Sequence, residues 1–200
     1  KLFSAKPRTL VFQDAREWRF ASDAGCVSSA TGNWSDDTKW TDASCGASHY
    51  PGQGGATTDT ATIADIAHTI TLDVTTTIAA LTLCDSACAQ SATLTHGTTN
   101  GLTVNGAVTV NGGAGAGDTV RWNINAGSAT STSAISYNPQ ATNAGRDAQV
   151  NITTGVLNAE GGITFEGTDT GHVDNQTLSI GADGLVKLKG AVSNLNTFAD

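Results

Sequence analysis

The side chains best suited to chemistry lie in the last third of the chain. Glu160, Glu166, Asp169 and Asp174 fall close together in the sequence, with His172 among them. Carboxylate oxygens are the ligands that a hard cation such as Ca²⁺ prefers, and carboxylates also serve acid–base catalysis. No spacing here matches a calcium-binding loop. Glu166, Asp169 and Asp174 are therefore calcium candidates by residue type alone, and the sequence assigns no other metal ligand and no cofactor.

A search for nucleophiles and for lyase-type bases returns no catalytic residue. The chain has no Gly-x-Ser-x-Gly nucleophile elbow. A polysaccharide lyase needs a basic side chain beside an acidic cluster, and the few basic residues of the later chain adjoin no such cluster. The four histidines stand beside no obvious nucleophile: His49, His68, His96 and His172. We therefore expect a protein that is not an enzyme.

Four cysteines, Cys26, Cys45, Cys84 and Cys88, form an even set, as expected for disulfides in an oxidising compartment. Four cysteines allow three pairings. Proximity in the sequence favours Cys26 with Cys45 and Cys84 with Cys88. Zinc is the competing interpretation, but the Cys-x3-Cys spacing has no partner pair of like spacing.

Three aromatic residues in the first quarter of the chain have two interpretations. Trp34, Trp40 and Tyr50 could form a platform that contacts glycans. Alternatively they pack inside the first coil of the fold, because aromatic side chains bury the largest areas in a core. The sequence favours packing.

The elements that would position these residues are short strands. From Ala61 onward, apolar residues alternate with polar ones at a period of two, which indicates strands with one buried face. Asn-Gly and Asp-Gly pairs separate them and predict sharp corners. The predicted strands include Leu102–Val104, Val108–Val110, Val120–Ile124, Val150–Ile152, Ile163–Phe165, Leu178–Ile180 and Leu185–Leu188.

Strand spacing favours one all-β fold over another. Residues 102–106 and 108–112 repeat at a six-residue step, which is shorter than the spacing expected for a β-sandwich or jelly roll. We predict a right-handed parallel β-helix, also called a β-solenoid, with the sandwich as the alternative. The rhythm breaks at residues 112–118, 128–147 and 166–175, which we expect to be loops that project from the coil.

The order of motifs near the start carries a resemblance. Gly32-Asn33-Trp34-Ser35-Asp36 and Trp40 come first, followed by Tyr50-Pro51-Gly52 and then the strand patterns at residues 59–63 and 69–73. This order resembles the beginning of parallel β-helix regions in bacterial extracellular surface proteins, such as autotransporter passengers and repetitive adhesins. The resemblance implies a β-solenoid and an extracellular, cell-surface location. It leaves the function open, since such coils serve as adhesins, filaments and polysaccharide-cleaving enzymes.

The first residues differ from the rest of the chain. Residues 1–25 hold half of the Lys and Arg and a group of large apolar side chains. We predict an N-terminal cap and first-coil segment over residues 1–50 and a solenoid body over residues 51–200, because the end of a stacked array needs a cover. A strand at Leu10, Val11 and Phe12 could instead pair with another copy by β-augmentation.

Composition restricts the partners. The net charge of −8 argues against nucleic acid, which requires a basic face, and no apolar run reaches the length of a membrane span. We expect an extracellular structural or adhesive surface protein, with itself as partner, that forms a filament or a surface layer by strand pairing between copies. A carbohydrate-binding module that contacts glycans and a polysaccharide-active enzyme are the alternatives.

Overall fold

The computed structural model describes residues 25–41, 45, 49–64, 67–85, 90–112, 118–138, 147–165 and 175–193. These residues form three sheets, which we name A, B and C, and two short 3-10 helices, η1 (Asp37–Lys39) and η2 (Gln53–Gly55). Sheet A contains β1 (Gly25–Ser28), β3 (Trp40–Thr41), β4 (Thr60–Ile63), β7 (Ala80–Leu83), β10 (Val108–Asn111), β13 (Ile135–Asn138), β16 (Ile163–Phe165) and β19 (Val192–Ser193). Sheet B contains β2 (Gly32–Asn33), β5 (Thr69–Leu72), β8 (Ala92–His96), β11 (Thr119–Ile124), β14 (Asp147–Ile152) and β17 (Asn175–Ile180). Sheet C contains β6 (Thr76–Ile78), β9 (Gly101–Val104), β12 (Ser128–Ser131), β15 (Val156–Ala159) and β18 (Leu185–Leu188).

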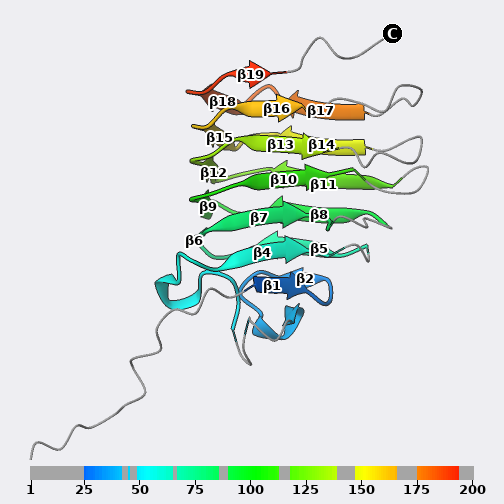
Figure 1. Ribbon diagram of the computed structural model, residues 1–200, viewed down its shortest axis with the longest axis vertical. Coiled ribbons are helices and arrows are strands. Elements are labelled where there is room, and N and C mark those ends of the chain that lie inside the picture. Colours follow the sequence, from blue (N-terminus) through cyan, green and yellow to red (C-terminus); the bar gives the residue numbers. More distant parts are fainter. Residues whose placement is uncertain are drawn as a thin grey trace, which may run out of the picture.

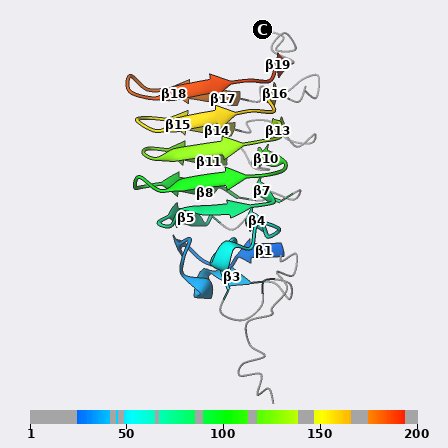
Figure 2. The ribbon, with the colours of Figure 1, turned by 90° about the vertical axis from the view of Figure 1, so that its left-hand side faces the viewer.

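The strands stack as a β-solenoid, so the predicted fold is confirmed. From β4 onward the chain visits sheets A, B and C in turn, and each strand pairs in parallel with the strand three places later in the sequence. Figure 1 shows the turns rising in chain order from β1 to β19, and Figure 2 shows the same stack from its side. A β-sandwich is excluded because its strands pair mainly antiparallel. The right-handed sense of winding stays a prediction.

The alternation of residue types explains why these segments form strands. In β5 and β7 the burial pattern alternates strictly, with each buried residue followed or preceded by a partly exposed one. Equivalent inward positions stack into columns along the solenoid axis, because the parallel ladders keep their register from turn to turn. One column in sheet B consists of Ile70, Leu94, Trp122, Val150 and Leu178.

The connections between sheets have characteristic lengths. Sheet C strands join sheet A strands through residues 105–107, 132–134, 160–162 and 189–191. Sheet B joins sheet C through similarly short corners, and one of them requires glycine. Gly127 has a φ of 69°, and a Cβ there would collide with the backbone carbonyl of Asn100 in the preceding turn. The long connections, residues 84–91, 112–118, 139–146 and 166–174, all run from sheet A to sheet B.

Two details of the sequence prediction are corrected. The six-residue step between Leu102 and Val108 is the distance across one corner, from β9 to β10, and not the length of a coil. The true repeat is visible in a sheet A column, where each residue lies 27 to 29 positions after the last: Leu81, Val108, Ile135, Ile163 and Val192. The loop predicted at residues 128–147 contains β12 and β13. It resembled a loop because the inward residues of β12 are Ala129 and Ser131, which give a weak apolar signal.

Candidate functional site

A short antiparallel strand covers the outer edge of sheet A in the first described turn. β3 pairs antiparallel with the outer edge of β1, while β1 and β2 pair in parallel with β4 and β5 of the body. The predicted disulfide between Cys26 and Cys45 joins β1 to the segment after β3. η1 lies just before β3, and a hydrogen bond from the side chain of Thr38 lowers the pKa of Asp36 at its N-cap. Sheet A therefore has a covered edge at this end.

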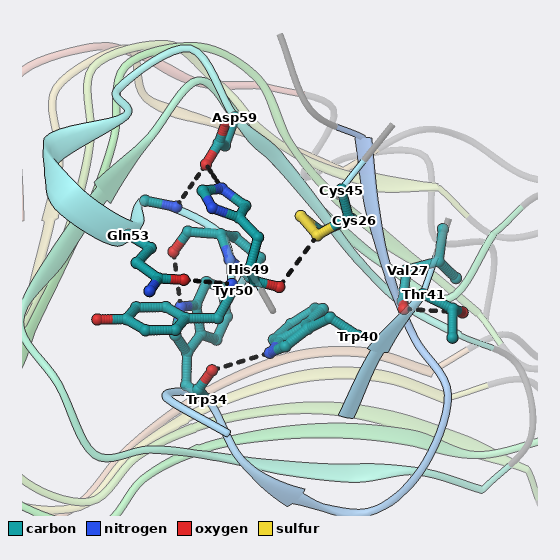
Figure 3. Close-up of a disulfide and its surroundings, with 12 residues drawn as sticks. Cys26, Val27, Trp34, Trp40, Thr41, Cys45, His49, Tyr50, Gln53 and Asp59 are labelled. Carbon is teal, nitrogen blue, oxygen red and sulfur yellow. Dashed lines mark hydrogen bonds and ion pairs between the residues drawn. A yellow bond between two sulfur atoms is a disulfide. The ribbon is translucent and has the colours of Figure 1, made fainter. Parts of the chain in front are cut away.

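The aromatic residues at this end are part of the core. Trp34 is fully buried and Trp40 is 5% exposed, and their rings meet edge to face with centroids 4.9 Å apart. The Trp40 indole N–H donates to the Trp34 carbonyl oxygen at 2.8 Å (Figure 3). A sugar-binding platform needs exposed aromatic faces, so the glycan-contact hypothesis is wrong for both tryptophans. Tyr50 is partly exposed and packs against the same core, as the alternative interpretation predicted.

A buried carboxylate fixes the turn that follows Tyr50. Asp59 is fully buried, and its Oδ2 lies 2.8 Å from Nε2 of His49 and accepts a hydrogen bond from the Gly52 amide at 2.8 Å (Figure 3). The neighbouring Pro51 carbonyl oxygen accepts from the Trp34 indole N–H at 2.9 Å. These contacts connect the turn to the first coil. Sequence reasoning did not identify the pair, because the two residues are ten positions apart and match no motif.

A serine–histidine contact also escaped the sequence search. Ser28 Oγ lies 3.1 Å from His68 Nδ1, although the residues are 40 positions apart. The same oxygen accepts a hydrogen bond from the Ala64 amide at 2.8 Å. Ser28 is 2% exposed and His68 is 9% exposed, so the pair is closed to a substrate. Its geometry ties the end of β1 to β4 and β5 rather than activating a nucleophile.

His96 lies in the interior of the solenoid. It occupies an inward column of sheet B between Leu72 and Ile124, and it is fully buried. The Trp122 indole N–H donates to His96 Nε2 at 2.9 Å, whereas Nδ1 finds no hydrogen-bond partner among the described residues. Burial lowers the pKa of His96 to about 4. The imidazole is therefore neutral at pH 7, and it is an acid-sensitive point of the core.

Tyr137 is a second buried polar side chain. Its ring stacks on Phe165 of the next turn, with centroids 4.8 Å apart. Burial raises the pKa of its phenol well above the ordinary value, and the hydroxyl has no hydrogen-bond partner among the described residues. The two stacked rings fill the core between β13 and β16.

Large apolar side chains are exposed in the last described turn. Within residues 175–193, no strand pairs with the far edge of β17 or of β18. Ile180 continues an inward column of sheet B and Leu188 one of sheet C, yet they are 51% and 45% exposed. Leu185 on β18 is 45% exposed as well. Their predecessors in the two inward columns, Ile152 and Ala159, are buried beneath β17 and β18, whereas no described strand covers Ile180 or Leu188.

Several predicted site residues lie outside the described part of the chain. They include the residues of the predicted self-association strand and the three calcium candidates. Cys84 is disulfide-bonded, and its predicted partner is also outside. In the described ranges, no group of three or more His, Cys, Asp or Glu residues is placed to hold a metal ion, and no helix has the length and apolarity to cross a bilayer. The residues outside are Leu10, Val11, Phe12, Cys88, Glu166, Asp169 and Asp174.

Comparisons with known proteins give no relative. No family model matches the chain, and neither the curated proteins nor the solved structures searched contain a match. The described residues form a β-solenoid in which a strand lies beyond β1 in sheet A and no described strand lies beyond β17 or β18. The resemblance to bacterial surface proteins stays a prediction at the level of family.

Proposed function

We propose that this chain is an extracellular structural or adhesive surface protein, and that its copies join by strand pairing into a filament or surface layer. The observation that supports the proposal is the edge of β17 and β18, which no described strand covers. Inward side chains that are buried in every earlier turn are about half exposed there. An unpaired strand edge with adjacent apolar side chains is a template for another strand.

The remaining features fit a scaffold. The described interior is filled with columns of apolar residues, and the polar pairs at His49, Ser28 and His96 are held by contacts within the fold. The Cys26–Cys45 disulfide supports an oxidising, extracellular location for the protein. The glycan-binding alternative loses the two tryptophans on which it depended.

Deletion of residues 1–13 tests the proposal, since these residues include the strand expected to pair with another copy. We expect the full chain to form fibres or sheets in negative-stain electron microscopy, and the shortened chain to stay monomeric with an unchanged β-sheet circular dichroism spectrum. A full-length chain that stays monomeric at high concentration would contradict the proposal. Equal assembly of both chains would contradict the role of residues 1–13.

A further inference from the structure

Three asparagines of the solenoid are each followed by a glycine, and they are Asn100, Asn105 and Asn111. Such an asparagine can lose its side-chain ammonia when the main-chain nitrogen of the glycine attacks the side-chain carbonyl carbon, because glycine has no Cβ to hinder the approach. The reaction requires an accessible asparagine amide and a glycine N–H that no hydrogen bond holds. The three pairs differ in how they meet these conditions.

Asn105 has a reactive arrangement. It lies between β9 and β10, at a corner from sheet C to sheet A, and its side chain is exposed. Within the described part of the chain, no hydrogen bond holds its side-chain amide or the N–H of Gly106. The attacking nitrogen and the amide that it attacks are therefore both free to react.

Hydrogen bonds hold the pair at Asn100. Thr75 Oγ1 accepts a hydrogen bond from the Gly101 amide at 3.2 Å and donates one to the Asn100 side-chain oxygen at 3.4 Å. The Asn100 side-chain nitrogen donates to Thr98 Oγ1 at 2.6 Å. These bonds must break before Gly101 can attack, so the population that can react is smaller than at Asn105.

Burial protects Asn111, which is the last residue of β10. Its side chain donates to the Cys84 carbonyl oxygen, and the residue is 4% exposed. Asn105 and Asn111 have the same immediate neighbours, since each follows a valine and precedes a glycine. Their intrinsic reactivities in an unfolded chain are therefore nearly equal, and a difference between them in the folded protein comes from the fold.

We propose that Asn105 is a site of spontaneous deamidation and that the fold protects Asn100 and Asn111. Hydroxide removes the proton of the Gly106 amide, and the nitrogen attacks Cγ of Asn105. A succinimide ring forms as the bond from Cγ to Nδ2 breaks, and the leaving nitrogen takes protons from water and departs as ammonia. A water molecule then opens the ring at either carbonyl, which leaves aspartate or isoaspartate.

The corner at Asn105 contacts the turns on both sides. The Asn105 amide donates to the Ile78 carbonyl oxygen of the preceding turn at 2.9 Å, and its carbonyl oxygen accepts from Thr132 Oγ1 of the following turn at 2.7 Å. Isoaspartate adds a methylene group to the main chain and turns this carbonyl into a side-chain carboxylate. Aspartate changes only the charge of an exposed side chain. Isoaspartate should therefore weaken the stacking of three turns, whereas aspartate should not.

Peptide mapping measures the three reactions in one sample. The oxidised full chain is incubated in mildly alkaline buffer made with water that carries heavy oxygen, so that opening of each succinimide introduces one labelled atom. Electron-transfer fragmentation then locates the label and distinguishes isoaspartate from aspartate. The same incubation in concentrated urea gives the intrinsic rates, and Thr75→Val tests the protection of Asn100. Thr75 is exposed and valine has a similar shape, so the fold should survive this change.

In the folded chain, Asn105 should react at least about tenfold faster than Asn111, because reaction at Asn111 requires local opening of the core. In urea the two rates should converge. Thr75→Val removes the acceptor of the Gly101 N–H, so the rate at Asn100 should rise about fivefold while the rate at Asn105 stays unchanged. The isoaspartate form, separated by chromatography, should unfold at a lower urea concentration than both the natural chain and Asn105→Asp.

Equal rates at Asn105 and Asn111 in the folded chain would overturn the proposal. So would the absence of label at Asn105 in a folded sample whose urea-treated counterpart is labelled. An unchanged rate at Asn100 in Thr75→Val would overturn the protection assigned to Thr75. An isoaspartate form as stable as Asn105→Asp would overturn the link between this corner and the neighbouring turns.

Discussion

Acidification should weaken the middle of the solenoid through His96. The side chain is fully buried between Leu72 and Ile124, and its pKa is lowered from 6.5 to about 4 by burial. Above pH 6.5 the imidazole is neutral in both the folded and the unfolded chain. Between pH 6.5 and 4 the unfolded chain takes up a proton that the folded chain does not bind. The free energy of unfolding therefore falls as the pH drops through this window, and this contribution stops changing below pH 4.

The size of the effect follows from the shift. A difference of about 2.5 pKa units corresponds to about 3 kcal/mol, at 1.36 kcal/mol per unit. The hydrogen bond to Trp122 is consistent with this direction. His96 Nε2 accepts from the indole N–H at 2.9 Å, so a proton on Nε2 would place two donors against each other.

The assay is a series of urea unfolding curves, followed by circular dichroism from pH 7.5 to pH 4, on the natural chain and on His96→Leu. Leucine continues the column between Leu72 and Ile124 without a titrating group. Carboxylates that titrate in the same window are common to both chains, so the difference between the two curves isolates His96. We expect the natural chain to lose about 3 kcal/mol relative to the variant between pH 7 and pH 4. A pH-independent difference, or a nuclear magnetic resonance titration of His96 with a pKa of 6.5 or above, would refute the reasoning.

Further predictions concern the disulfide, a buried hydroxyl and a corner glycine. Replacement of Cys26 and Cys45 by serine removes a disulfide between residues 19 positions apart, and it should lower the free energy of unfolding by about 3 kcal/mol. The unfolding temperature should fall below that of the oxidised natural chain, and an unchanged value would contradict this prediction. Tyr137→Phe removes a buried hydroxyl that has no partner among the described residues, so the free energy of unfolding in urea should stay equal or rise by up to about 1 kcal/mol. A clear loss of stability would show that the hydroxyl is paired. Gly127→Ala should lower the free energy of unfolding by about 2 kcal/mol or more, because the residue has a φ of 69° and an added Cβ would collide with the carbonyl of Asn100. Gly97→Ala is the control, since an added Cβ there makes ordinary contacts, and it should change stability by only about a few tenths of a kcal/mol. Equal effects of the two substitutions in the same unfolding assay would contradict the strain argument.

Much of the fold could be predicted from local alternation. Val120, Trp122 and Ile124 are separated by polar residues, and they all point inward from β11, as the period of two requires. The coil length could not be read in the same way. Inward columns preserve burial but not residue type, as in Leu94, Trp122 and Val150, and the connections from sheet A to sheet B vary in length. The coil therefore repeats in the structure, but neither residue types nor a fixed number of residues repeat in the sequence.

The candidate sites were less predictable. The pairing of Cys26 with Cys45 followed from proximity in the sequence. The burial of Trp34 and Trp40 depends instead on β3, which folds back antiparallel on β1. The contacts of His68 with Ser28 and of His49 with Asp59 depend on stacking between distant segments, so no local motif announces them. The exposure of Ile180 and Leu188 likewise appears only when the inward columns are followed to the last described turn.

The central claim is that the edge of β17 and β18, which no described strand covers, is an association surface. The most direct measurement is the mass distribution of the oxidised chain by sedimentation velocity, with negative-stain electron microscopy of the same samples, beside a chain that carries Ile180→Lys and Leu188→Lys. Both replaced side chains are about half exposed, so the fold should survive their replacement. The account predicts ordered assemblies from the natural chain and a folded monomer from the lysine chain. A monomeric natural chain, or assemblies unaffected by the two lysines, would contradict it.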